Sequence, residues 1–182
     1  MRSKVLGMLL AGATLMLGAG NADKPAPGTD AAIAAQVRHE LVMYPRYTIW
    51  DDVSFRVNGG QVELSGAVTQ PFKKSDMERL VRDVPGVTGV SDQIEVLPLS
   101  NQDDRLRVQV AQAIYRDPTL NRYALEALPP IHVIVDNGHV TLNGVVSTEM
   151  EKQVAGLRAS AAGLSFGPVV NNLRVENPSR KS

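Results

Sequence analysis

Two stretches decide the fold of this chain: VSFRVNGGQVELSGAV at residues 53–68 and IHVIVDNGHVTLNGVV at residues 131–146. They align without a gap at a constant offset of 78 residues, so the sequence contains an internal repeat. Both alternate apolar and polar residues, the pattern of strands with one buried face. The residues identical in the two copies are Val57, Gly60, Val62, Leu64, Gly66 and Val68, which recur as Val135, Gly138, Val140, Leu142, Gly144 and Val146.

Each stretch contains a dipeptide that favours a tight turn, Gly59-Gly60 in the first copy and Asn137-Gly138 in the second. These residues adopt the positive φ angles that a two-residue hairpin turn requires, so each stretch is predicted to be a β-hairpin. Together with Gly66 and Gly144, the four turn residues are interpreted as structural. The turn fixes the register and places Arg56 opposite Glu63. The predicted core-facing residues are Val53, Phe55, Val57, Val62 and Leu64 in the first copy, and Ile131, Val133, Val135, Val140 and Leu142 in the second. The predicted solvent-facing residues include Ser54, Asn58, Gln61, His132, Ile134, Asp136, His139, Thr141 and Asn143.

An amphipathic helix is predicted before each hairpin, and the two copies of this helix align at an offset of 73 residues. Apolar residues recur at helical spacing after an acidic residue, which we interpret as the N-cap: Asp30 in the first copy and Asp103 or Asp104 in the second. Pro45 and Pro118 are predicted to close the helices. The core-facing residues are Ile33, Val37 and Leu41, and Leu106, Val110 and Ile114. The change of offset indicates a five-residue insertion at 119–130.

A second helix, at about 71–83 or 148–162, and a short last strand complete each unit. The inward residues of that strand are predicted to be Ile94 and Val96, or Leu173 and Val175. The fold class is therefore α+β, with two αββαβ modules that each form a small three-stranded mixed sheet with two helices on one face. The predicted boundaries are 30–98 for the first module, 99–102 for the linker, 103–176 for the second module and 177–182 for a disordered tail.

Composition excludes several classes of protein. The 182 residues include 19 basic and 19 acidic ones, so the basic face of a nucleic-acid-binding protein is not expected. The absence of cysteine excludes disulfides, thiolate chemistry, zinc–thiolate sites and an N-terminal lipid anchor, so the protein is not a lipoprotein. Neither a metal site nor a cofactor site is legible in the sequence.

The first 22 residues are predicted to be an export signal with cleavage near Ala22. They combine basic Arg2 and Lys4 with an apolar run that is too short to span a bilayer. Residues 23–29 are read as a flexible spacer. We expect the mature protein to be periplasmic, without a transmembrane segment and with a formal net charge of −2.

The helix, the signature VIVDNGHVTLNGVV at residues 133–146 and the ending at 163–175 with Asn171-Asn172-Leu173 resemble the BON domain. That domain is named from osmotically inducible and nodulation proteins of bacteria, and the tandem arrangement resembles the osmotically inducible protein Y. The first copy departs from the pattern at Asn58-Gly59-Gly60 and at Asp92-Gln93-Ile94. The resemblance implies a periplasmic, non-catalytic module that attaches to phospholipid surfaces and acts in envelope maintenance and osmotic stress.

The residues themselves do not favour catalysis. His132 and His139 flank one hairpin, but the register separates them by about 13 Å, too far to share a metal ion. His39 and Glu40 are neighbours on a helix and point in different directions. We therefore interpret the histidines as solvent-facing and the protein as no enzyme.

Five of the eight aromatic residues occur at the end of the first helix and in the following loop of each copy, with arginines beside them. Amphipathic rings and guanidinium groups are the groups that bind lipid headgroups, so these residues form the candidate lipid-binding or partner-binding site. The candidates are Tyr44, Arg46, Tyr47 and Trp50 in the first copy, and Arg105, Tyr115, Arg116, Arg122 and Tyr123 in the second. Alternatively, the rings fill the gap between helix and sheet or the interface between modules.

The two copies carry formal charges of −3 at 30–98 and −1 at 103–178, so an anionic bilayer would repel the second copy less. Arg105, Gln109, Gln112 and Arg116 are predicted to line an exposed stripe of its first helix. We expect peripheral binding to anionic phospholipid or to envelope proteins. A second hypothesis is a periplasmic chaperone or assembly factor that binds unfolded clients in an apolar groove between the modules.

Overall fold

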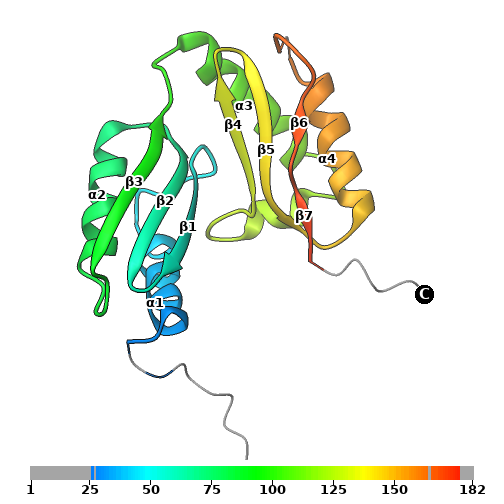
Figure 1. The fold of residues 1–182 in the computed structure, drawn as a ribbon. Helices are drawn as coiled ribbons and strands as arrows, with labels where there is room; N and C mark the ends of the chain where they lie inside the picture. The colour runs from blue at the N-terminus through cyan, green and yellow to red at the C-terminus, as the bar shows by residue number, and fades with distance from the viewer. Residues whose placement is uncertain (1–25, 27, 164, 177–182) are drawn as a thin grey trace, which may run out of the picture.

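The computed structural model describes residues 26, 28–163 and 165–176, and shows two α/β modules that follow one another along the chain (Figure 1). The predicted signal at 1–22, most of the spacer at 23–29 and the tail at 177–182 lie outside the described residues. The elements of the first module are α1 (Asp30–Val42), β1 (Asp52–Asn58), β2 (Gln61–Val68), α2 (Pro71–Arg82) and β3 (Gly89–Val96). Those of the second are α3 (Asn101–Tyr115), the 3-10 helix η1 (Asn121–Leu125), β4 (Ile131–Asp136), β5 (His139–Val146), α4 (Glu149–Ala161), β6 (Val170–Asn171) and β7 (Arg174–Val175).

Both sheets are mixed, which confirms the α+β class and the repeated αββαβ order. β1 pairs antiparallel with β2, and β3 pairs parallel with β2 on its other side. In the second module β4 pairs antiparallel with β5, but the last strand is broken into β6 and β7, which both pair parallel with β5. β1 and β4 are therefore the outer strands of their sheets, and each has one edge without a neighbouring strand.

The hairpin register agrees with the prediction. Arg56 lies opposite Glu63, and His139 lies opposite Asp136. Gly59 and Gly60 have φ angles of 58° and 79°, and the turn of the second module has the same left-handed backbone. These positive φ angles explain why glycine and asparagine occur at the two turns.

Each module has its own core between the sheet and the two helices. In the first module Ile33, Val37 and Leu41 of α1 are buried against β2 residues, and the equivalent residues of α3 are buried in the second. One strand prediction is wrong: Val96 is exposed and Leu97 is buried in its place, because the chain leaves the regular strand there. Leu173 is buried as predicted.

The acidic residues at the starts of α1 and α3 are not N-caps, which corrects the sequence prediction. The N-caps are Thr29 and Ser100, whose side chains accept the backbone N–H groups of residues 32 and 103. α3 consequently begins at Asn101, inside the predicted linker.

The carboxylates of Asp30 and Asp103 instead bind the hairpin turns. Asp30 accepts the amides of Gly59 and Gly60 at 2.8 and 2.9 Å. Asp103 accepts the amides of Asn137 and Gly138 at 3.0 and 2.9 Å. In each module one carboxylate therefore joins the start of the first helix to the hairpin turn.

The outer face of β4 is covered, so the prediction that it faces solvent is wrong. The side chains of His132 and Ile134 are buried. His132 Nδ1 lies 2.6 Å from the carbonyl oxygen of Asp51, and Asn143 donates to the carboxylate of Asp52 at 2.7 Å. The segment that leads into β1 thus docks on the second module and holds the two modules together.

The loop before the first strand is anchored to the start of the second helix in both modules, but by different chemistry. In the first module the buried carboxylate of Asp51 accepts from the Thr69 amide at 2.9 Å and from Lys73 Nζ at 2.6 Å. At the equivalent place in the second module the Tyr123 hydroxyl accepts from the Ser147 amide at 2.9 Å. The same hydroxyl donates to the Glu151 carboxylate at 3.1 Å, and that carboxylate also pairs with Arg122 at 2.5 Å.

Candidate functional site

Among the described residues the buried ionisable groups hold the fold. No group of three His, Asp or Glu side chains in this part of the chain could bind a metal ion. His132 is buried at the contact between modules, 5.6 Å from the Tyr47 ring, rather than solvent-facing as predicted. Over the same residues, no helix is both long and apolar enough to cross a bilayer.

In the first module the candidate residues join the end of α1 to the start of α2. Tyr44 is buried and its hydroxyl donates to Asp76 at 2.7 Å; burial, with the hydrogen bond and charge of Asp76, raises the pKa of Tyr44 to about 12. Arg46 is exposed, and its guanidinium lies 5.2 Å from the centre of the Phe72 ring and 3.9 Å from the Asp76 carboxylate. Tyr44 and Arg46 are therefore brought together.

Tyr47 and Trp50 lie at the contact between the modules. The Tyr47 hydroxyl accepts the Val53 amide at 3.0 Å, and burial raises the pKa of Tyr47 well above its usual value. Ile49 and Trp50 pack, half-buried, against the core of the second module. These two rings therefore lie at the interface between the modules, which was the alternative to a binding site in the sequence analysis.

The aromatic candidates of the second module are used internally. The Tyr115 hydroxyl donates to the Ile131 carbonyl at 2.6 Å, and burial raises the pKa of Tyr115 above its usual value. Tyr123 is buried, and the Arg122 guanidinium lies 4.8 Å from the centre of its ring. Arg105 on α3 and Arg116 at its C-cap are exposed. The structure therefore separates the second-module candidates into an internal group and an exposed basic pair.

Sequence reasoning missed two exposed apolar residues next to Arg46. The side chain of Met43 is 63% exposed and that of Phe72 is 45% exposed. Both lie where α1 ends and α2 begins, the place that Tyr44 and Arg46 hold together. The signal available in the sequence was an apolar residue that falls outside the core-facing positions of each helix. We call Met43, Arg46 and Phe72 the helix-end patch.

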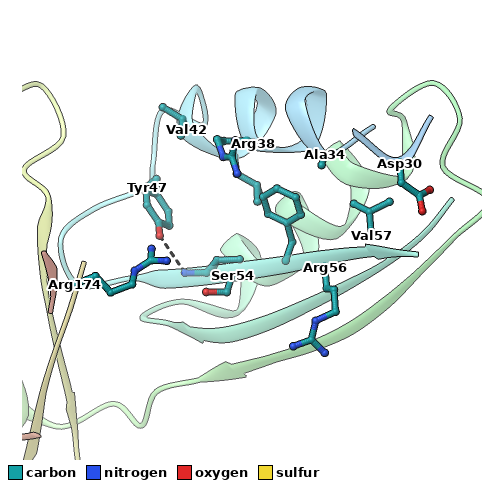
Figure 2. A pocket seen from close by; sticks show the side chains of 12 residues that line it. Asp30, Ala34, Arg38, Val42, Tyr47, Ser54, Arg56, Val57 and Arg174 are labelled. Carbon is teal, nitrogen blue, oxygen red and sulfur yellow. Dashed lines mark hydrogen bonds between the residues drawn. The ribbon is translucent and has the colours of Figure 1, made fainter. Parts of the chain in front are cut away.

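A groove of about 610 Å³ runs between α1 and the outer edge of β1 (Figure 2). Arg38 comes from α1, with its guanidinium 5.9 Å from the centre of the Phe55 ring, and Arg174 enters from the second module. Figure 2 shows Arg38 beside α1 and Arg174 reaching toward Tyr47 and Ser54. The groove therefore combines an apolar floor with three arginines, since Arg56 also lines it, and with the carboxylate of Asp30.

Comparison with curated proteins finds no match to the chain. Among solved structures, CdsD of Chlamydia trachomatis, a structural protein of the type III secretion system, is 16% identical with a TM-score of 0.32, over 79% of this chain and 61% of that one. The C-terminal domain of CdsD is 17% identical with a TM-score of 0.32, over 78% of this chain and 63% of that one. The chain thus spans about three fifths of each CdsD chain, and at this TM-score the likeness informs neither fold nor function.

The family comparison is more specific. The model of the BON domain matches residues 29–98 and again residues 102–177. The two matches coincide with the two αββαβ modules of the structure and cover most of the chain. The chain therefore belongs to the BON-domain family, as a protein with two BON domains in tandem.

Proposed function

We propose that this protein is a non-catalytic, exported adaptor that attaches reversibly to anionic phospholipid surfaces of the bacterial envelope. The family and the predicted signal at residues 1–22 support this proposal, since BON domains are generally non-enzymatic and associated with membranes or lipids. A role in envelope maintenance under osmotic stress belongs to the same proposal.

The observation that carries the location is the helix-end patch. The exposed Phe72 ring lies under the guanidinium of Arg46, and the exposed thioether of Met43 is at the C-cap of α1, three residues before that arginine. The apolar groups of such a patch enter the boundary between headgroups and acyl chains, while the guanidinium binds phosphate oxygens. Arg46 shares Asp76 with Arg79, so one carboxylate faces two guanidinium groups and the patch keeps a local positive charge.

The patch favours the first module over the second, although the second has the smaller negative charge. Tyr115 and Tyr123 donate their hydroxyls inside the second module, and Arg122 pairs with Glu151. Arg105 and Arg116 remain as exposed basic groups there, and among the described residues neither guanidinium stacks on an aromatic ring. They serve as the comparison site in the test below.

The chaperone hypothesis requires an apolar groove between the modules. The hollow between the two sheets, of about 390 Å³, is lined mainly by polar groups that include Asp52, Gln93 and Glu95. A polar, acidic lining does not favour binding of unfolded, apolar segments. We therefore propose lipid as the ligand and keep client binding as an outcome of the test.

The test is co-sedimentation of the mature protein with phosphatidylglycerol vesicles at low and at high salt. Removing the apolar part of the patch with Met43→Ser and Phe72→Ser is expected to weaken binding about 30-fold, since partial insertion of two such side chains contributes about 2 kcal/mol. Arg46→Gln is expected to weaken binding roughly fivefold and to reduce its salt dependence, because one cation near an anionic surface contributes about 1 kcal/mol.

The matched control is Leu157→Ser, which removes an equally exposed apolar side chain from α4 of the second module and is expected to leave binding unchanged. A second comparison is Arg105→Gln with Arg116→Gln. If these two substitutions abolish sedimentation with vesicles and the patch variants do not, the site lies on α3 and its C-cap. Failure of the wild-type protein to sediment at low salt refutes lipid binding, and suppression of client aggregation by the same protein would support the chaperone hypothesis.

A further inference from the structure

The outward edges of β1 and β4 are equivalent in the repeat but differ in what covers them. In β4 the backbone groups of Ile131, Val133 and Val135 point away from β5, as their hydrogen bonds show. The offset of 78 residues maps these positions onto Val53, Phe55 and Val57 of β1. The two edges can therefore be compared group by group.

The edge of β4 is closed by three hydrogen bonds. The carbonyl of Ile131 accepts from the Tyr115 hydroxyl at 2.6 Å, and that of Val135 accepts from Arg107 at 2.6 Å. Between them, the amide of Val133 donates to the carbonyl of Ile49 at 2.8 Å. A segment of the first module therefore acts as a partial extra strand on the second sheet.

The edge of β1 is open. The helix positions that provide Arg107 and Tyr115 in the second module are occupied by Ala34 and Val42 in the first, and neither can donate a side-chain hydrogen bond. The Val53 amide donates to Tyr47, but within residues 28–163 and 165–176 no hydrogen bond reaches the outward groups of Phe55 or Val57. The small residues leave the groove described above directly beside this edge.

We propose that a second copy of this chain fills the groove with the end of η1 and the loop that follows it, at residues 124–128. The loop corresponds to the segment of the first module that closes β4, because both lie between the first helix and the first strand of their module. Leu125, the last residue of η1, is 88% exposed, and Glu126 directly after it has an extended backbone, with φ −76° and ψ 146°. The Glu126 amide donates to the Tyr123 carbonyl at 3.3 Å in the free chain, so the occupant offers an apolar side chain at once and its backbone groups when the last turn of η1 opens.

Length and charge also fit. Ala124 and Leu125 belong to η1, so the last turn of η1 opens on binding. In extended form the five residues then span about 13 Å, the same as the five residues of β1 from Val53 to Val57. The carboxylate of Glu126 would meet Arg38 and Arg174, for which the described residues provide no salt bridge. Addition of a strand to an exposed sheet edge, with backbone hydrogen bonds for affinity and a pocket for alternate side chains, is an established mode of peptide recognition.

The contact joins different surfaces of the two copies, the loop of one and the groove of the next. In such a head-to-tail contact each copy can bind two neighbours, one through its groove and one through its loop. The copies therefore form an open chain or, if the rotation between them closes, a ring. The average mass in solution is therefore expected to rise with concentration.

One experiment uses the absence of cysteine from the sequence. A Val42→Cys protein and a Leu125→Cys protein are mixed and oxidised, so that a disulfide between the two variants can form only between molecules. We expect a Val42–Leu125 heterodimer and little product when Leu157→Cys, on α4, replaces the loop variant. Equal yields for the loop and the α4 cysteines would overturn the proposal.

The second experiment closes the groove from within. Ala34→Arg with Val42→Tyr copies the residues that close β4, and circular dichroism is expected to show an unchanged fold. In sedimentation equilibrium of the mature protein, the wild-type mass is expected to increase with concentration and the variant is expected to stay monomeric. A wild-type protein that is monomeric at millimolar concentration, or a folded variant that associates like the wild type, would refute the proposal.

Discussion

The buried ion pair between Asp51 and Lys73 provides the sharpest test of how the first module is held together. Asp51 is 0% exposed, and its carboxylate accepts from Lys73, from Thr69 and from the amide and hydroxyl of Thr48. The perturbation is Lys73→Met, which keeps a side chain of similar length and removes the charge. Asp51 is then left as a buried carboxylate without its cation.

The magnitude follows from the burial of both groups, whose side chains are 0% and 7% exposed. Removing one partner of such a pair costs about 3–5 kcal/mol, because the remaining charge stays desolvated. A small protein has a free energy of unfolding of about 5–15 kcal/mol, so the first module would lose a large part of its stability. With a urea dependence of about 1 kcal/mol/M for a small module, the unfolding midpoint is expected to fall by roughly 3–5 M.

The assay is urea unfolding of the mature protein, followed by circular dichroism and by the emission of Trp50, the single tryptophan. The matched control is Arg79→Met, which breaks an exposed pair with Asp76 at 2.8 Å on the same helix. Exposed pairs contribute less than about 1 kcal/mol, so the control midpoint is expected to move little.

The pH dependence adds an independent check. Burial alone would raise the pKa of Asp51, but the hydrogen bonds from Lys73, Thr69 and Thr48 and the Lys73 charge hold it below its usual value. The pair therefore stabilises the protein at neutral pH, and this contribution is lost as the pH falls below about 4. The difference between wild type and Lys73→Met is expected to shrink there. A neutral-pH difference no larger than that of Arg79→Met would refute the reasoning.

Three further predictions concern a hairpin turn, a glycine inside β5 and the contact between the modules. Asp30→Ala removes the carboxylate that binds the turn amides, and is expected to cost about 2 kcal/mol and to speed hydrogen exchange of the Gly59 amide; unchanged exchange would contradict this. Gly144→Ala is expected to cost at least about 3 kcal/mol in thermal unfolding, because φ is 121° and a Cβ would overlap a backbone carbonyl. A melting temperature equal to that of wild type would show the strain to be absent. His132→Ala removes the ring that contacts Asp51, and is expected to shift Trp50 emission to longer wavelength; a smaller shift than in a solvent-facing variant such as His139→Ala would count against this contact.

The repeat and the hairpin turns made the architecture predictable from sequence. A two-residue turn needs positive φ angles, few residue types provide them, and the alternation on either side then fixes which residues face the core. Val96 shows where this reasoning stops, because alternation holds only as long as the strand stays regular. The acids Asp30 and Asp103 show a second limit: an acid at a helix start is commonly a cap, and its actual partners, the turn amides, are distant in sequence.

The candidate site was harder to predict because the same residue types can either bind a ligand at the surface or form hydrogen bonds inside the fold. A tyrosine beside an arginine can bind a headgroup, or it can donate its hydroxyl to a buried carbonyl, as Tyr115 does. Only the position of the acceptor separates these outcomes. The contact between modules left one signal in the sequence, the apolar Ile134 on a face that should be polar. The open edge of β1 left another, the small residues Ala34 and Val42 where the second copy has Arg107 and Tyr115.

The docking of Ile49 and Trp50 on β4 matters to anyone who dissects the protein into halves. A fragment that begins at residue 100 would keep the hydrogen bonds from Tyr115 and Arg107 but lose the one from the Val133 amide to Ile49, and it would expose the apolar surface that the two side chains normally hide. Unpaired strand edges recruit other strands, so the fragment is expected to be prone to aggregate. Binding of the isolated second module to membranes or proteins would then result from the surface that the truncation exposes and would not be a property of the intact chain.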